Sequence, residues 1–203
     1  SYNFIEHYEI SFMIVFIVLV TLLILYIVYE NHTRNKELLK YAQTDALTGL
    51  YNKETTEQLT DELLSEDENK SHAFLILDVD CFKQINDIYG HAVGDIVLQK
   101  FGKLLKGTFR EGDILGRIGG DEFGVIMKNI QTKDIAMKKA GELLAKTQAY
   151  KIDELKGNNI SISIGISTAP QDGDCYMDLY KRADQALYQA KRSGKARVCN
   201  YFS

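Results

Sequence analysis

The hydrophobic positions of this chain form one long uninterrupted run followed by several short periodic ones. The long run covers residues 10–29, reads ISFMIVFIVLVTLLILYIVY and holds no charged residue. About 20 consecutive apolar residues are enough for a helix to cross a hydrocarbon core of about 30 Å. Because nearly every side of this helix would be apolar, the pattern favours a transmembrane helix over the buried core helix of a soluble domain.

The charges on either side of residues 10–29 predict how the helix is oriented. No basic segment precedes the run, as a signal peptide would require, and acidic residues stand there instead. The basic residues lie just after it: Arg34, Lys36 and Lys40. By the positive-inside rule we expect a short extracytoplasmic stub at residues 1–9, a single pass through the inner (cytoplasmic) membrane, and a C-terminal part in the cytoplasm.

After the hydrophobic run, polar residues with interspersed leucines at 30–43 suit a helix that continues from the membrane as a signalling linker. Thr, Asp, Gly and Asn then mark a turn, and we expect one cytoplasmic domain over residues 44–203. The first residue is Ser1 rather than Met, which suggests a processed product or a fragment whose missing part could hold a sensor.

Within residues 44–203 the pattern alternates between strand-like and helix-like segments. The apolar runs at Ala73–Val79, Glu122–Met127 and Asn159–Thr168 predict strands. Apolar stripes with helical spacing predict helices over residues 54–64, 98–109, 135–144 and 179–190. The expected fold is an α/β (α+β) sandwich with a mixed or antiparallel central sheet flanked by helices.

Composition narrows the class of protein. The chain has 203 residues, 45% of them hydrophobic, and a net charge of −4, which fits one globular domain with a small appendage. The negative charge argues against a nucleic-acid binder, although it leaves room for a small anionic nucleotide. Three scattered cysteines, Cys81, Cys175 and Cys199, indicate a reducing compartment and lack the spacing of a zinc site.

Acidic residues at the end of the first predicted strand are the first candidates for chemistry. Asp78 and Asp80 follow the apolar run Phe74–Leu77 and share one face of the strand because side chains alternate with a period of two. Carboxylates held at a strand end are common ligands of Mg²⁺. The sequence therefore predicts a metal site at this end of the sheet.

The run Gly119–Phe123 reads Gly-Gly-Asp-Glu-Phe and is the second candidate. Its glycines permit positive φ and close backbone approach, and its paired carboxylates offer hard oxygen ligands. Taken alone, Gly-Gly-Asp is also typical of an ordinary hairpin turn. Its meaning depends on which residues the fold brings beside it.

Polar residues between the first strand and the next helix form the third group. Lys83 and Asn86 have the spacing of adjacent turns on one helix face, and a break follows at Gly90. A lysine suits a phosphate and an asparagine suits the edge of a base. Taken singly, His91 reads as a turn residue and Asp95 as an ordinary helix N-cap.

Taken together, these segments resemble a known family. DALTGLYNK, LDVDCFKQINDIYGHAVGD, RIGGDEF, SISIGIS and ADQALYQAKRSGKARV occur in this order across Asp45–Val198 and are similar to the GGDEF domain of bacterial diguanylate cyclases. The resemblance implies a fold like the palm of nucleotidyl cyclases and polymerases. It also implies condensation of two GTP molecules into cyclic di-GMP with release of two pyrophosphates.

The resemblance also implies a metal site and the catalytic residues. Its ligands would be Asp78, the Val79 carbonyl and Asp121, with Glu122 as a further ligand, and they would hold Mg²⁺, with Mn²⁺ as an alternative. Asp121 and Lys83 would be catalytic: Asp121 assists loss of the hydroxyl proton, and Lys83 neutralises charge on the triphosphate.

Substrate contacts follow from the same resemblance. Asn86 and Asp95 would read the guanine, and His91 would line its pocket. The triphosphate would contact the side chains of Lys83, Lys191 and Lys195 and the backbone amides around Cys81 and Phe82. Many relatives carry arginine in place of Lys195, and a lysine keeps the charge but loses the planar fork.

An inhibitory product site is implied by a further match. Arg110 and Asp113 form an Arg-x-x-Asp pattern at the family's usual separation before Gly119, and this pair would hold cyclic di-GMP. The alternative for such a pair is a surface salt bridge at a helix end.

The leading hypothesis is a membrane-anchored, product-inhibited diguanylate cyclase that works as a homodimer, because each domain would hold one GTP. One alternative is a catalytically silent domain that binds GTP or cyclic di-GMP as a receptor or scaffold. Competent residue types at Asp78, Lys83, Asp121 and Glu122 count against it. Another is a cyclase that makes a mixed dinucleotide, which Asn86 and Asp95 disfavour.

Overall fold

The structure, a computed structural model, describes residues 2–66 and 70–201, without the side chains of residues 2–12, 14–15 and 35–41. It divides into two compact units, Ser1–Ala42 and Gln43–Ser203. The first is formed by α1 (Tyr2–Gln43), a single helix. Within α1, Phe16–Arg34 is long and apolar enough to cross a membrane, and all of its side chains lie exposed. That exposure separates it from the core helix of a soluble domain.

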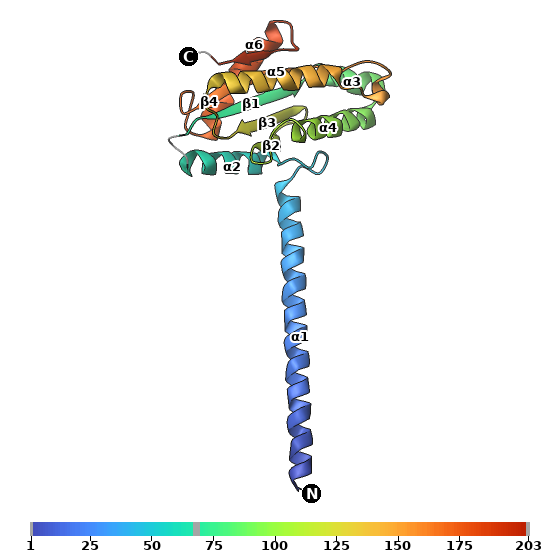
Figure 1. Ribbon diagram of the computed structural model, residues 1–203. Coiled ribbons are helices and arrows are strands. Elements are labelled where there is room, and N and C mark those ends of the chain that lie inside the picture. The colour runs from blue at the N-terminus through green and yellow to red at the C-terminus, as the bar shows by residue number, and fades with distance from the viewer. Residues whose placement is uncertain (1, 67–69, 202–203) are drawn as a thin grey trace. The chain divides into compact units, whose positions relative to one another are not determined.

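A five-stranded sheet forms the centre of the second unit (Figure 1). Its strands are β1 (His72–Val79), β2 (Ile114–Arg117), β3 (Glu122–Met127), β4 (Ile162–Ala169) and β5 (Val198–Asn200). In the order β2-β3-β1-β4-β5, every neighbouring pair is antiparallel except β4 and β5, which run parallel. The sheet is therefore mixed, and β1 lies at its centre.

Helices cover both faces of this sheet. They are α2 (Lys53–Glu66), α3 (Phe82–Tyr89), α4 (His91–Lys106), α5 (Lys133–Ala149) and α6 (Tyr176–Arg192), with a short 3-10 helix at Asp153–Leu155. On one face, α2 and α6 pack against alternate side chains of β1 such as Phe74 and Ile76. On the other face, α4 and α5 pack against Leu75 and Leu77. The period of two in β1 thus divides its side chains between two cores.

One close contact fixes the position of α6 on the sheet. A Cβ placed on Gly165 of β4 would lie 2.1 Å from the carbonyl oxygen of Ala183 and 2.3 Å from the amide nitrogen of Leu187. Only glycine lets the helix backbone approach the strand this closely. This contact sets the distance of the C-terminal turn of α6, which carries Lys191, from the end of β1.

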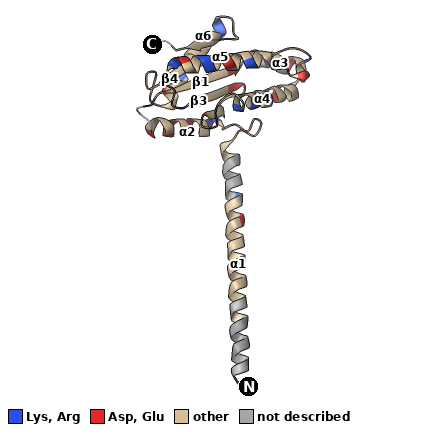
Figure 2. Ribbon diagram, in the orientation of Figure 1, with Lys and Arg blue, Asp and Glu red and all other residues tan. Residues whose placement is uncertain are grey.

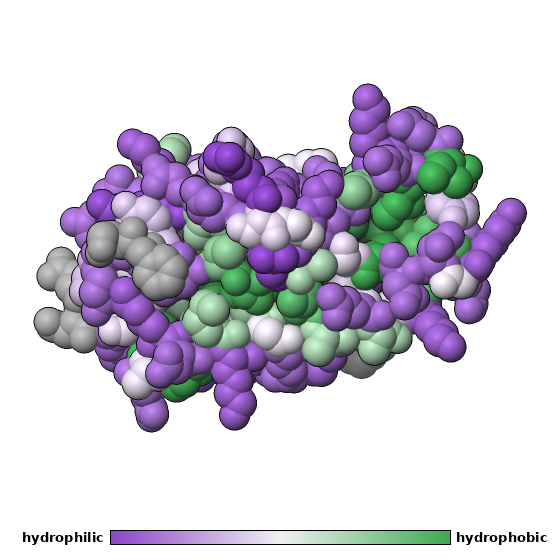
Figure 3. Space-filling model, turned by 90° about the horizontal axis from the view of Figure 1, so that it is seen from above, coloured by the Kyte–Doolittle hydropathy of each residue, from purple (hydrophilic) through white to green (hydrophobic). Residues whose placement is uncertain are grey.

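The surface of the second unit is mainly polar. Figure 3 shows one face on which hydrophilic residues predominate and hydrophobic ones are visible between them. Among the described residues of the second unit, the large hydrophobic side chains that stand exposed are few and come from α3, α5 and the two ends of α6: Ile88, Ile135, Met177 and Tyr188. Such scattered side chains do not form a continuous apolar patch.

The fold class expected from the sequence is confirmed, and so are the strand at Glu122–Met127 and, with one added residue, the strand at Ala73–Val79. The expected strand at Asn159–Thr168 begins too early. Asn159 pairs instead with Lys151 as an isolated bridge, and the regular ladder starts at Ile162. β5 has only three residues and carries no alternating pattern that would have predicted it.

Candidate functional site

The pairing of β1 with β3 brings acidic residues from both strands together. Asp78, near the end of β1, lies directly opposite Glu122, the first residue of β3. The ladder continues into the turn, where the Val79 amide donates a hydrogen bond to the carbonyl oxygen of Asp121 (3.2 Å). Asp78 is buried between two neighbouring strands, whereas Asp121 and Glu122 are half-buried. Figure 2 shows acidic residues where β1 ends and β3 begins.

Lys191 joins this cluster from the last turn of α6. Its Nζ lies 2.7 Å from Oδ2 of Asp78. Burial raises the pKa of Asp78 above its ordinary value, the Lys191 ammonium opposes this shift, and the charges of Asp121 and Glu122 add to it. Lys191 thus contacts Asp78 alone of the three carboxylates, and the negative charge of Asp121 and Glu122 beside Asp78 favours a bound cation.

A divalent metal ion fits these donors because Asp78, Asp121, Glu122 and the Val79 carbonyl offer only hard oxygen atoms. The carboxylate oxygens of Asp78, Asp121 and Glu122 do not all lie close enough together to bind one ion. Among the described residues, a group of three ligand atoms within 4.8 Å of one another occurs elsewhere, at Asp174, Cys175 and Asp178. The carboxylates of the candidate site would therefore have to move closer around an ion.

The turn between β2 and β3 contains Gly119 and Gly120. The glycines there permit a positive φ, but neither Gly119 nor Gly120 adopts one. Close approach does explain Gly119, since a Cβ there would lie 2.9 Å from Oε2 and 3.1 Å from Cβ of Glu122. The amides of Ile118 and Gly119 both donate to the Glu122 carbonyl, which closes the turn tightly.

Arg117, a residue that the sequence analysis did not single out, stabilises this turn through its side chain. Its Nε and Nη2 donate to the Gly120 carbonyl at 3.1 and 2.7 Å. Its Nη1 lies 3.2 and 3.1 Å from the two carboxylate oxygens of Asp45, in the segment that follows α1. Burial raises the pKa of Asp45, but hydrogen bonds from Thr48 and the Arg117 charge outweigh this and leave it lowered.

The same segment also pairs with the sheet through its backbone. The amide of Tyr51 donates to the Leu115 carbonyl (3.0 Å), and the amide of Arg117 donates to the Tyr51 carbonyl (2.8 Å). The exposed edge of β2 is thereby covered. The segment that connects α1 to the domain is thus bonded directly to the strand that ends in the acidic turn.

We expect Arg117→Ala to loosen this turn. Loss of the contacts to Asp45 and Gly120 should lower the free energy of unfolding by about 1–3 kcal/mol, because a charged, half-buried group loses its partners. Denaturant titration measures this loss. Arg182→Ala, which removes a cation–π contact with Tyr201, is the matched control. Equal stability of the two variants would contradict this role of Arg117.

The segment α3–α4 carries the residues expected at the base. The side chain of Asn86 lies over Gly94: a Cβ on Gly94 would meet Asn86 Oδ1 at 1.9 Å. Gly94 precedes Asp95, so the structure brings the backbone of Asp95 beside Asn86. Lys83, His91 and Asp95 itself have exposed side chains. These groups are therefore open to a ligand.

Lys195 and Cys81 meet at the start of α3. Lys195 Nζ lies 3.1 Å from Cys81 Sγ, and this contact, with the charges of Asp80 and Asp78, raises the pKa of Lys195. Cys81 has a left-handed backbone (φ 58°) and leads into Phe82, the first residue of α3. The structure therefore places one of the expected triphosphate lysines beside the expected triphosphate amides.

Asp80 differs from Asp78 although the sequence placed both on one face as candidate metal ligands. Its carboxylate accepts hydrogen bonds from the hydroxyls of Ser161 and Ser163 (both 2.7 Å) and from the Ala196 amide (3.0 Å). Both oxygens of Asp80 are thus engaged within the protein. Only Asp78 of the two is directed to the acidic cluster.

Arg110 and Asp113 lie near the opposite end of β3. Arg110 Nε is 3.1 Å from Asp113 Oδ1, Asp113 also accepts the Lys128 amide (3.1 Å), and Arg110 Nη2 donates to the Lys128 carbonyl. The Arg110 side chain is exposed while that of Asp113 is buried. A pocket of about 510 Å³ adjoins the pair and is lined also by Thr108, Asn129 and Lys139.

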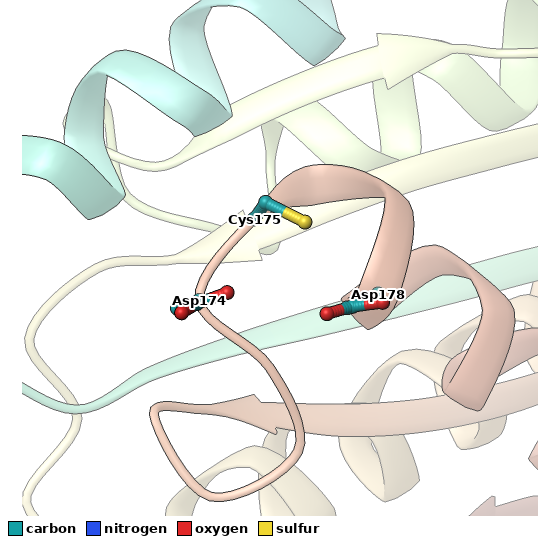
Figure 4. Close-up of side chains that lie close together, drawn as sticks. All are labelled: Asp174, Cys175 and Asp178. Atoms are coloured by element: carbon teal, nitrogen blue, oxygen red, sulfur yellow. The ribbon is translucent and has the colours of Figure 1, made fainter.

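The group Asp174, Cys175 and Asp178 lies at the start of α6 (Figure 4). It follows the C-terminal end of β4, which pairs with the beginning of β1, so it is at the opposite end of the sheet from Asp78. Asp174 and Asp178 are exposed, as solvated acids commonly are. The group contributes nothing to the site at Asp78.

Comparison with known proteins identifies a family with a similar sequence. The family model described as "Diguanylate cyclase, GGDEF domain" matches residues 42–197. Diguanylate cyclase A from Treponema denticola is 37% identical over 171 residues, which are 81% of this chain and 46% of that protein. Against the first three curated relatives, the chain spans between 39% and 52% of their own lengths.

Solved structures show the same fold. The isolated GGDEF domain of TpbB from Pseudomonas aeruginosa matches with a TM-score of 0.74 and 33% identity, covering 78% of this chain and 94% of that one. The GGDEF domain of DgcB from Caulobacter crescentus, in complex with c-di-GMP, matches with a TM-score of 0.73 and 27% identity, covering 80% and 94%.

Proposed function

The chain belongs to the GGDEF family of diguanylate cyclases, and on this basis we propose that it condenses two GTP molecules into cyclic di-GMP and two pyrophosphates. The observation that supports this most strongly is the pairing of Asp78 with Glu122, beside Asp121 and Lys191. A cluster of carboxylates next to an ammonium suits a triphosphate with its metal ion better than it suits any neutral ligand.

The metal ion would be Mg²⁺, with Mn²⁺ as an alternative, and its ligands would be Asp78, the Val79 carbonyl, Asp121 and Glu122. When bound, such an ion neutralises the triphosphate and polarises the reacting phosphoryl group. The Lys191 ammonium, now on Asp78, would turn to a phosphate oxygen. Lys83, Lys195 and the amides around Cys81 and Phe82 would bind the remaining oxygens: Lys83 and Lys195 are exposed, and Lys195 already touches Cys81.

Asn86 and Asp95 would recognise the guanine, and His91 would line its pocket. An amide and a carboxylate together can meet both the acceptor and the donor groups on the edge of guanine. Gly94 supports this pairing because its missing Cβ leaves the space that the Asn86 side chain occupies. The same two residues favour GTP over ATP, and therefore cyclic di-GMP over a mixed dinucleotide.

In the reaction, the 3′-oxygen of one GTP forms a bond to the α-phosphorus of the other, and the bond from that phosphorus to pyrophosphate breaks. Asp121 would accept the hydroxyl proton, because its half-buried carboxylate lies in the turn beside the end of β1, where the triphosphate would bind. Lys83 would stabilise the charge that develops on the leaving group. A second such step closes the ring.

Because each domain would bind one GTP, the two nucleotides meet only when two domains face each other. We therefore propose that the active form is a homodimer. Its rate per chain should rise with chain concentration. The segment after α1, bonded to β2 and to Arg117, would connect any movement of the helices to the turn that carries Asp121.

The function is tested with the purified full chain in detergent, incubated with GTP and Mg²⁺, with the products resolved by chromatography. We expect cyclic di-GMP to form and its formation to stop when EDTA is added. Binding of GTP without formation of any cyclic dinucleotide would instead indicate a silent receptor domain.

We further propose that Arg110 and Asp113 bind cyclic di-GMP as an inhibitor. The exposed guanidinium of Arg110 is available to a phosphate or a guanine edge, and the adjoining pocket can admit part of the dinucleotide. The DgcB domain from C. crescentus was solved in complex with c-di-GMP. In this chain, the ligand would compete with Asp113 and Lys128 for Arg110.

Arg110→Ala should weaken cyclic di-GMP binding by about tenfold or more, since it removes charge-assisted hydrogen bonds. The initial rate should stay similar because Arg110 lies at the opposite end of β3 from Asp121. Calorimetric titration with cyclic di-GMP measures the affinity, with Glu111→Ala as the neighbouring control. Unchanged affinity in Arg110→Ala would count against the inhibitory site.

Finally, we propose that α1 crosses the inner membrane once, with the second unit in the cytoplasm. The exposed apolar side chains of Phe16–Arg34 support this. The intact chain should then sediment with membranes and need detergent for extraction, while a chain without residues 1–29 should stay in solution. Ultracentrifugation of cell lysates distinguishes the two. Recovery of the intact chain in the supernatant would overturn the proposal.

A further inference from the structure

The loop between α6 and β5 has an unusual backbone. Three successive residues, Gly194, Lys195 and Ala196, have positive φ values of 110°, 59° and 48°. Left-handed backbone is unfavourable for residues with a Cβ, and two such residues in a row persist only where surrounding contacts hold them. The contacts that hold this loop therefore decide where the Lys195 side chain lies.

Asp80 supplies the central one of these contacts. Its Oδ2 accepts a hydrogen bond from the Ala196 amide (3.0 Å), and Asp80 reaches this amide from the end of β1, more than a hundred residues earlier in the chain. Two further bonds flank it: the Lys195 amide donates to the Ala190 carbonyl (3.1 Å), and the Ile164 amide donates to the Arg197 carbonyl (2.9 Å). Of the three, only the bond from Asp80 is made by a side chain.

The orientation of Asp80 is itself fixed. Ser161 and Ser163 donate hydroxyl hydrogen bonds of 2.7 Å to its two oxygens, and the side chain is 7% exposed. A buried carboxylate with three donors can neither rotate nor accept an ion without losing a partner. Asp80 therefore acts as a fixed acceptor at the base of the loop.

We propose that Asp80 is a positioning residue for the triphosphate: it holds the loop 193–197 so that Lys195 stands beside Cys81 at the start of α3. This inference rests on the proposed function of the site. In the protein without ligand, Lys195 Nζ already lies 3.1 Å from Cys81 Sγ, at the segment whose amides would bind phosphate. Asp80 thus contributes to substrate binding through Lys195 and without touching the substrate.

The test measures binding of 3′-deoxy-GTP with Mg²⁺ to the full chain in detergent by calorimetric titration. This nucleotide lacks the attacking hydroxyl, so the readout is affinity and not turnover. Lys195→Ala should weaken binding about tenfold, as expected for loss of one charged contact. Asp80→Ala should weaken binding by a similar factor.

The double variant decides whether the two residues act together. If Asp80 acts through Lys195, Asp80→Ala combined with Lys195→Ala should bind about as weakly as either single variant. A loss of about a hundredfold, the product of the single losses, would overturn the proposal, as would wild-type affinity in Asp80→Ala. Asp172→Ala is the matched control, because Asp172 is also a buried carboxylate, bonded to Thr168 at the opposite end of β4.

Asp80→Asn keeps the proposal testable should Asp80→Ala not fold. Its amide oxygen can still accept the Ala196 amide, so binding should stay within about threefold of wild type. A metal ligand would behave differently, and a loss in Asp80→Asn as large as that in Asp78→Asn would contradict a positioning role. If the wild type bound no nucleotide at all, the proposed function of the site would fail before Asp80 could be judged.

Discussion

Replacing Asp121 with asparagine should lower the rate of cyclic di-GMP formation on the order of a thousandfold, within the range for loss of a general base. Asp121 lies in the turn between β2 and β3, and its backbone carbonyl is bonded to the Val79 amide. The side chain can therefore change while the turn stays in place. The amide of asparagine can neither accept the hydroxyl proton nor supply the charge that a metal ion requires.

Initial rates of cyclic di-GMP formation, measured by chromatography, test this expectation. Thermal unfolding of the same preparation should be nearly unchanged, because Asp121 is half-buried and its described contacts are those of its backbone. Asp174→Asn, an exposed acid at the other end of the sheet, should keep full activity. An Asp121→Asn variant that retains more than about a tenth of the wild-type rate would remove Asp121 from the chemistry.

Asp78→Asn should have two opposite effects: loss of activity by a similar factor, and a gain in stability of the metal-free protein. Burial raises the pKa of Asp78 in the folded state, with Lys191 opposing and Asp121 and Glu122 adding to the shift. An acid whose pKa is raised on folding destabilises the fold once the pH exceeds its folded-state pKa. At neutral pH, asparagine avoids this cost.

The stability difference between Asp78→Asn and the wild type should depend on pH. As the pH falls from neutral through the raised pKa toward the ordinary value of 3.8, wild-type Asp78 becomes protonated in the fold and its destabilisation disappears. The advantage of Asp78→Asn in melting temperature should therefore be largest at neutral pH and should shrink on acidification.

Initial rates measure the loss of activity, and thermal unfolding in EDTA and in Mg²⁺ measures the change in stability and the effect of the metal ion on it. Mg²⁺ should raise the melting temperature of the wild type and leave that of Asp78→Asn unchanged, because a ligand stabilises only the form that binds it. A metal-free Asp78→Asn variant that melts below the wild type would show that the salt bridge to Lys191 outweighs the cost of burial.

Much of the site could be predicted because its residues lie where local patterns are strong. Asp78 ends a continuous apolar run, and Glu122 begins another, so the sequence shows that both acids stand at strand ends. It does not show that the two strands are neighbours in the sheet, because pairing depends on contacts between distant segments. The resemblance to a family supplied that link, and the register of β1 with β3 gives it a physical basis.

The remaining contacts join residues that lie far apart in the sequence, and a local pattern cannot predict such pairs. Arg117 bonds Asp45, which lies 72 residues before it, and Asp80 bonds the Ala196 amide 116 residues after it. The two-residue period made Asp78 and Asp80 equivalent. Of the two, only Asp80 accepts hydrogen bonds from the serines next to β4 and within it. The need for glycine at position 119 is likewise set by a neighbour, since the side chain of Glu122 occupies the space that a Cβ would take.

The most direct test of the central claim is the ratio of the two products formed by the full chain. Purified protein in detergent is incubated with GTP and Mg²⁺, and cyclic di-GMP and pyrophosphate are quantified in the same sample. The account predicts two pyrophosphates for each cyclic di-GMP, and formation of both products on the order of a thousandfold slower in Asp121→Asn. Binding of 3′-deoxy-GTP by a wild-type protein that releases no pyrophosphate and forms no cyclic di-GMP would contradict it.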